Sequence, residues 1–144
     1  MLKRVDLKIK SYIDNVDEDG RVDREESEST HKAALKISCG ETSLSYREAT
    51  ESGSVFSDIL VHESGAVTVR RTGAIDSTLH FDENEEFNTV YSLPPYKFDM
   101  TVKTEKIKNT LSALGGLIEI KYEMSVGGAK KRVLMQIEAS EEKR

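Results

Sequence analysis

Alternation of apolar and polar residues is the feature that most constrains how this chain can fold. Every second residue is apolar from Val5 to Ile9 and again from Ile118 to Val126. Because a β-strand places successive side chains on opposite faces, each such segment predicts a strand that is buried on one side only. One-sided burial is typical of antiparallel sheets, since a buried parallel sheet is apolar on both faces.

Shorter segments with the same alternation fill the rest of the chain. They lie at residues 33–39, 44–48, 55–61, 67–71, 79–81, 91–93, 98–102 and 133–139. Hairpin turns are predicted between strands at residues 51–53, 63–65, 82–84, 93–95 and 127–128. Gly127-Gly128 is the best two-residue turn signal, because glycine adopts the left-handed conformations that tight hairpins require. Roughly ten strands at this spacing are typical of sandwiches and barrels.

A meander of this kind must dispose of its two exposed edges, and closure into a barrel removes them. The sequence therefore predicts an all-β fold, a single antiparallel up-and-down β-barrel of about 8–10 strands. A two-sheet sandwich is the alternative. With 144 residues the chain has the length of one domain. We expect this domain to cover residues 1–140, followed by a disordered tail at 141–144.

Residues 105–114 depart from the alternation. Ile107, Leu111 and Leu114 have helical spacing, with Thr104 able to cap the start of a helix and Gly115 its end. A short helix at one end of the barrel and an irregular strand are both consistent with this segment.

The charge balance is acidic, with 21 basic and 26 acidic side chains and a net charge of −5. This balance argues against a nucleic-acid partner or an anionic membrane surface, either of which favours a basic stripe. The two basic clusters, Arg70-Arg71 and residues 130–132, are short. Nucleic acid and membranes are therefore not expected as partners. The expected partner is a small hydrophobic or anionic ligand, and a protein partner is unknown.

Cys39 is the single cysteine and cannot form an internal disulfide, which suits a reducing compartment. It shares the apolar parity of its segment, so a buried, unreactive thiol is expected. The first residues show no secretory pattern, and no apolar stretch approaches the ~18 residues of a membrane span. A cytoplasmic protein is the resulting expectation.

Several segments resemble, in order and spacing, those of a known family. They are Leu44-Ser45-Tyr46-Arg47-Glu48, Val69-Arg70-Arg71-Thr72-Gly73, Leu79-His80-Phe81, residues 89–96 and residues 116–124. Together they resemble the YwiB-like family of uncharacterised bacterial β-barrel proteins, over the stretch from Ser43 to Ala139. The resemblance implies a lipocalin-like (calycin) barrel. It implies no established activity and provides no catalytic residues.

Two charged residues, Arg71 and Glu48, fall on the same side of their predicted strands as apolar residues and are therefore expected to face the interior. Each needs a partner there, because an unpaired buried charge costs several kcal/mol. They can pair with each other and with the hydroxyls of Tyr46, Tyr91 or Tyr122. Alternatively, Arg71 binds the carboxylate or phosphate of a small ligand through its two-pronged guanidinium. A β-bulge would turn either residue outward. These five residues form the predicted ligand-binding site.

The acidic segment Asn15–Glu26 has the spacing of an EF-hand calcium loop, with Gly20 at its sixth position and Glu26 at its twelfth. Its first position lacks a charge, however, and the preceding residues alternate like a strand rather than a helix. A solvated, acidic hairpin loop is the simpler interpretation.

No catalytic or metal-binding constellation emerges from the remaining residues. The histidines His31, His62 and His80 are not at metal-ligand spacing, and zinc needs three or four ligands. His62 and His80 fall on polar parities, so exposed side chains are expected. No Ser-His-Asp order, nucleophile elbow or phosphate-binding glycine loop is present. We therefore predict no metal, no cofactor and no enzymatic activity.

Two functions of different classes remain. The first is a cytoplasmic barrel that binds a small amphipathic or anionic ligand in its interior. The second is a non-enzymatic structural or protein-interaction module with a solidly packed barrel. Interior volume separates them, because a ligand cavity is expected to reach ~300 Å³ or more.

Overall fold

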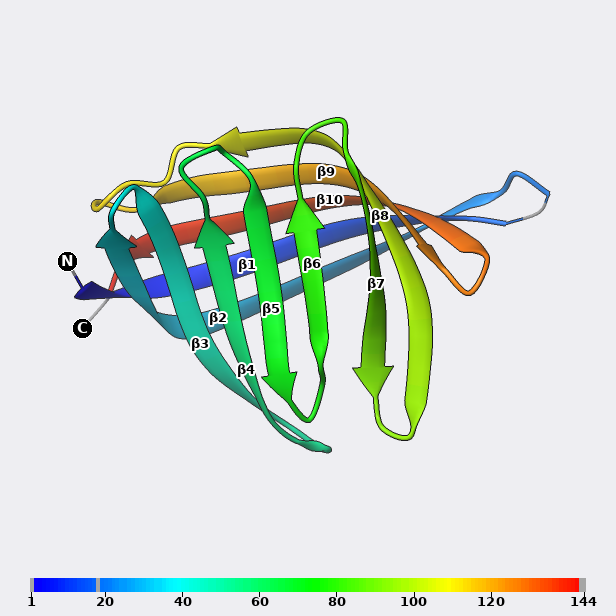
Figure 1. Ribbon diagram of the computed structural model, residues 1–144, viewed down its shortest axis with the longest axis horizontal. Helices are drawn as coiled ribbons and strands as arrows, with labels where there is room; N and C mark the ends of the chain where they lie inside the picture. The colour runs from blue at the N-terminus through cyan, green and yellow to red at the C-terminus, as the bar shows by residue number, and fades with distance from the viewer. Residues whose placement is uncertain (1, 18, 143–144) are drawn as a thin grey trace.

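The computed structural model describes residues 2–17 and 19–142, and this part of the chain contains β-strands and no helix. Consequently it has no helix that could cross a membrane. Figure 1 shows the ten strands, which are β1 (Leu2–Val16), β2 (Val22–Ser38), β3 (Glu41–Thr50), β4 (Gly53–Val61), β5 (Val67–Gly73), β6 (Ser77–Phe81), β7 (Glu86–Leu93), β8 (Tyr96–Asn109), β9 (Gly116–Val126) and β10 (Ala129–Glu141). β10 thus includes Glu141 of the predicted tail, whereas residues 143 and 144 lie outside the described part.

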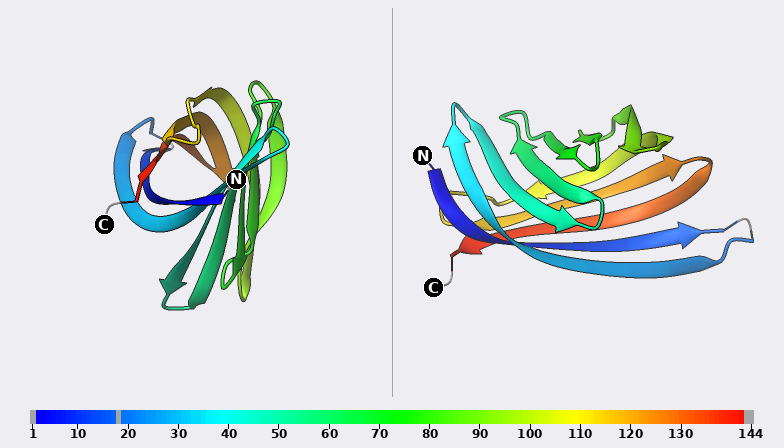
Figure 2. Two further views of the ribbon diagram at one scale, coloured as in Figure 1. Left: turned by 90° about the vertical axis from the view of Figure 1, so that its left-hand side faces the viewer. Right: turned by 90° about the horizontal axis from the view of Figure 1, so that it is seen from below.

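All ten strands form one antiparallel sheet in the order β6-β5-β4-β3-β2-β1-β10-β9-β8-β7. Neighbours in the sheet are consecutive in sequence except β1 and β10, so the N- and C-terminal strands lie side by side (Figures 1 and 2). The sheet curls until its edge strands meet. There the Asp76 N–H donates to the Ser92 carbonyl at 2.9 Å and the Ser92 N–H to the Asp76 carbonyl at 2.8 Å. The predicted up-and-down barrel is confirmed, and the sandwich alternative is wrong.

The core lies on the inner face that the alternation predicts. Leu7 of β1, Leu35 of β2 and Leu44 of β3 are almost fully buried, as are Ile118 and Ile120 of β9. Burial of one such aliphatic side chain stabilises the fold by about 1.5–3 kcal/mol. The apolar stripe of each strand is therefore what holds the barrel together.

Left-handed backbone occurs in several of the hairpin turns. Gly127 and Gly128 join β9 to β10 with φ values of 55° and 88°, as the sequence predicts. Cys39 and Gly40 join β2 to β3 in the same way, with φ values of 50° and 81°. Cys39 is consequently exposed, and the prediction of a buried thiol is wrong. β2 ends at Ser38, so the parity of the strand does not extend to the cysteine.

The helical alternative for residues 105–114 is wrong, and the irregular-strand alternative is correct. β8 continues to Asn109, with a register shift between Thr104 and Lys106 that inserts a bulge into its pairing with β9. The glycines after this segment close a hairpin instead of capping a helix. A Cβ atom on Gly116 would lie 2.3 Å from the Thr110 carbonyl oxygen, so only glycine fits there.

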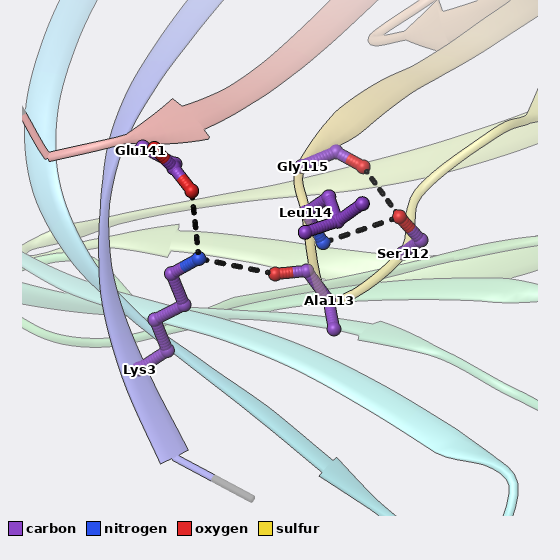
Figure 3. Close-up of polar contacts among 6 residues, drawn as sticks. All are labelled: Lys3, Ser112, Ala113, Leu114, Gly115 and Glu141. Atoms are coloured by element: carbon purple, nitrogen blue, oxygen red, sulfur yellow. Dashed lines mark hydrogen bonds and ion pairs between the residues drawn. The ribbon is translucent and has the colours of Figure 1, made fainter.

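The loop between β8 and β9 is fastened to the two terminal strands (Figure 3). Lys3 Nζ of β1 donates to the Ala113 carbonyl at 3.4 Å and lies 3.5 Å from Glu141 Oε1 of β10. Ser112 Oγ donates to the Gly115 carbonyl at 3.2 Å within the loop. These contacts hold the loop at the end of the barrel where both termini lie.

Candidate functional site

Arg71 lies on the inner face of β5, in a row of residues that runs across four strands. The register places it between Ser57 of β4 and Ser77 of β6, and Ser57 in turn lies opposite Tyr46 of β3. Directly paired residues of an antiparallel sheet share a face. Tyr46 and both serines are buried, while Arg71 is half-buried. The register therefore places Arg71 on the inner face of β5, with part of its side chain accessible to solvent.

Tyr122 of β9 lies within the electrostatic reach of Arg71. The phenol is 7% exposed, and its ring packs against Phe81 of β6 with a centroid distance of 4.7 Å. Burial raises the pKa of Tyr122 to about 12, and the positive charge of Arg71 opposes this rise. Tyr122 is thus a neutral hydroxyl at neutral pH and is available as a hydrogen-bond donor.

Two buried hydroxyl groups of the interior have no hydrogen-bond partner within residues 2–17 and 19–142. They are Ser57 Oγ, beside Arg71, and Thr104 Oγ1, whose residue pairs with Tyr122 in the register of β8 and β9. A buried hydroxyl without a partner costs about 1–3 kcal/mol, which makes such groups rare. Both residues follow the inward parity of apolar neighbours, and this signal could have identified them in the sequence.

Two further tyrosines of the predicted site have apolar or aromatic neighbours. The ring of Tyr46 stacks on that of His31 from β2, with a centroid distance of 4.3 Å and an interplanar angle of 23°. Tyr91 of β7 is half-buried and packs against the hydrophobic core. The structure thus places Tyr46 in the row of Arg71, and Tyr122 close to its charge.

Glu48 is exposed, unlike the other four residues of the predicted site. It lies opposite Val55, close to the turn between β3 and β4, and its side chain is exposed. No ion pair joins Arg71 to Glu48 or to another acidic side chain in the described part of the chain. The pairing of Arg71 with Glu48, one interpretation of the parity, is therefore not formed.

Five clefts have volumes of about 300 to 840 Å³, and Arg71 lines none of these five. Tyr122 of the predicted site lines the cleft of about 430 Å³, together with Lys121 and Val133. The 840 Å³ cleft lies beside the turn at Gly127-Gly128 and the end of β1 at Val16. A second, of about 600 Å³, lies along β1 and β2 and is lined mainly by polar and charged residues, among them Lys8 and Glu28.

The segment with EF-hand spacing is a hairpin between two strands. Asp17 Oδ1 accepts the N–H groups of Asp19 and Arg21 at 3.0 and 2.8 Å, so this carboxylate stabilises the turn itself. Glu26, the proposed bidentate ligand, lies opposite Tyr12 on β1. Glu18 lies outside the described residues. Among the residues that the structure describes, no three His, Cys, Asp or Glu side chains are grouped to hold a metal ion.

Comparison with known proteins agrees with this architecture. Residues 7–135 match a protein family described as a domain of unknown function, DUF1934. The chain belongs to this family. The crystal structure of the ywiB protein from Bacillus subtilis superposes on it with a TM-score of 0.81, at 25% sequence identity, over 99% of this chain and 94% of that chain. The resemblance to the YwiB-like family is therefore confirmed. No curated protein matches the chain. Membership of the DUF1934 family thus supports the barrel fold without assigning a reaction.

Proposed function

We propose that this DUF1934 protein is a non-enzymatic binding barrel that holds a small anionic ligand in its interior, with Arg71 as the anchor. The supporting observation is that Arg71 is half-buried on the inner face of β5 and has no acidic partner among the residues described. An inward-facing charge without a partner is costly, and an anion supplies the missing counter-charge.

The groups around Arg71 suit a carboxylate or a phosphate. A guanidinium offers two parallel N–H donors to such groups. Ser57 Oγ has no hydrogen-bond partner in the described part of the chain, and Tyr122 retains its proton, so both can donate to the same anion. Met124 and Met135 are only partly buried on the inner face, and flexible methionine side chains can adapt to an apolar portion of the ligand. An amphipathic acid therefore fits this surface.

The packing supports one alternative, a structural or protein-interaction module with a filled barrel. None of the five clefts is lined by Arg71, and the inner positions from Val5 to Ala139 form one continuous hydrophobic cluster. On this alternative Arg71 interacts with Tyr122 and solvent only, and no ligand is retained.

Native mass spectrometry of the protein purified from its own host tests the proposal. The two variants are Arg71→Leu and Arg70→Leu, since Arg70 is the exposed neighbour on the outer face of the same strand. We expect a bound small molecule on the wild-type protein and on Arg70→Leu, and its loss from Arg71→Leu. Unliganded wild-type protein, or equal retention by both variants, favours the packed module instead.

We also infer a cytoplasmic location. The single cysteine, exposed at the turn between β2 and β3, supports a reducing compartment because it has no partner for an internal disulfide. Fractionation of the host cells followed by immunoblotting tests this location.

A further inference from the structure

Strand pairing brings two histidines together that are far apart in the sequence. His62 follows the end of β4, Thr68 lies on β5, and His80 lies on β6 directly opposite Thr68. Thr68 is on the outer face, because its neighbours Val67 and Val69 are buried inside. Thr68 Oγ1 lies 2.8 Å from His62 Nε2 and 2.9 Å from His80 Nδ1. One nitrogen of each ring is therefore directed at the same small region.

Both rings are held in this orientation by other side chains. Glu41 Oε1 of β3 lies 3.4 Å from His62 Nδ1, on the side of the ring away from Thr68. The His80 ring meets the edge of Phe87 from β7 at a centroid distance of 5.7 Å. The two imidazole centroids are 6.0 Å apart. The side chain of His62 is 30% exposed, so solutes can reach the pair from solvent.

This arrangement has the chemistry of a metal-ligand pair. Neutral imidazole is the commonest metal ligand in proteins. A carboxylate that accepts a hydrogen bond from one ring nitrogen keeps the proton on that nitrogen, and the other nitrogen is then free to bind the metal. Glu41 has that position relative to His62. The Thr68 hydroxyl has one proton and donates to one of the two histidines only, so the other ring must donate to it. A metal ion bound by both ring nitrogens takes the place of the two hydrogen bonds that the rings now share with the Thr68 hydroxyl.

We propose that His62 and His80 bind one divalent metal ion of the class that prefers imidazole, such as Zn²⁺, on the outer face of the barrel. The Thr68 hydroxyl and water complete the coordination, since Glu41 contacts the opposite nitrogen of His62 and residues 2–17 and 19–142 contain no group of three His, Cys, Asp or Glu side chains that could hold a metal ion. Two nitrogen ligands select against Ca²⁺ and Mg²⁺, which require oxygen ligands. Zn–N bonds are ~2.0–2.1 Å long, which is shorter than the present distances from the two ring nitrogens to Thr68 Oγ1. Zinc binding therefore draws the two rings closer together.

Calorimetric titration with ZnCl₂ tests the proposal on full-length, chelator-treated protein from which any affinity tag has been removed. We expect one Zn²⁺ per chain and no heat with CaCl₂. Loss of an outer-shell partner already lowers metal affinity by about 10–100-fold. Because His62 and His80 are proposed as direct ligands, His62→Gln and His80→Gln are each expected to weaken zinc binding by at least about tenfold. His31→Gln is the matched control, because this histidine stacks on Tyr46 and is not part of the pair. Its zinc affinity is expected to equal that of the wild type.

NMR spectra of the imidazole groups provide a second readout that needs no variant to fold. Zinc should shift the ring signals of His62 and His80 and leave those of His31 unchanged. The proposal is overturned if wild-type protein shows no saturable zinc binding, or if the doubly substituted His62→Gln/His80→Gln protein binds zinc as well as the wild type. It is independent of the anion site, because the histidine pair lies on the outer face of the barrel and Arg71 lies on the inner face.

Discussion

Replacing Tyr122 with phenylalanine should remove an alkaline loss of stability that originates at this one residue. Below pH 10 the phenol is protonated in both the folded and the unfolded chain, so it makes no pH-dependent contribution. In the folded protein burial raises its pKa from 10.0 to about 12. Above pH 10 the unfolded chain therefore ionises first, and stability falls as the pH rises toward the folded pKa.

The size of this effect follows from the shift. One pKa unit corresponds to about 1.4 kcal/mol, so at pH 11 the contribution of Tyr122 to the free energy of unfolding should have fallen by about 1.4 kcal/mol relative to pH 9. Phenylalanine keeps the ring that packs against Phe81 but cannot ionise. The variant should therefore lose about 1.4 kcal/mol less than the wild type over this range.

Urea unfolding at pH 9 and pH 11, followed by circular dichroism, measures the difference. Every other ionisable residue is the same in the two proteins, so the remaining contributions cancel when the two pH-dependent losses are subtracted. Equal losses of stability in Tyr122→Phe and in the wild type would refute the reasoning, because they would mean that the phenol of Tyr122 is solvated in the folded barrel.

Three further predictions concern the fold. Leu35→Ala removes a fully buried side chain of β2 and should lower the free energy of unfolding, measured by urea denaturation, by about 2–5 kcal/mol. The control Leu2→Ala, at a position that is 72% exposed, should change it by less than about 0.5 kcal/mol. Gly128→Ala forces a side chain into the left-handed region at φ 88° and should cost about 1–2 kcal/mol; an unchanged unfolding midpoint would contradict this. Cys39 should react with a thiol reagent in the native protein at the rate of an accessible thiol, and a reaction that begins only in denaturant would show that the thiol is buried.

The inner and outer faces of the strands could be predicted from the sequence because the alternation is a local property. Residues such as Ile118 and Ile120 face the core whichever strands pair with theirs, since successive side chains of any strand point to opposite sides. The turn at Gly127-Gly128 was predictable for the same reason, as its left-handed backbone depends on two adjacent residues. Strand parity likewise indicated that Arg71 faces inward.

Local patterns failed where strand ends and bulges decide the outcome. Cys39 follows the parity of β2 but lies in the turn, and Glu48 follows the parity of β3 but lies in solvent near the end of its hairpin. In residues 105–114 the helical spacing gave way to pairing with β9 through a bulge. The strand was favoured there because β9 satisfies its backbone hydrogen bonds and the inward apolar residues join the core.

The sequence by itself determined that the chain forms antiparallel strands with one apolar face each, because a period of two residues is set within every strand. Only the tertiary structure decided which side chains meet. Arg71 acts on Tyr122 from the other half of the barrel, and His62 reaches His80 through Thr68. These contacts depend on strand order, register and closure at Asp76 and Ser92, which result from packing summed over the whole sheet rather than from a local pattern.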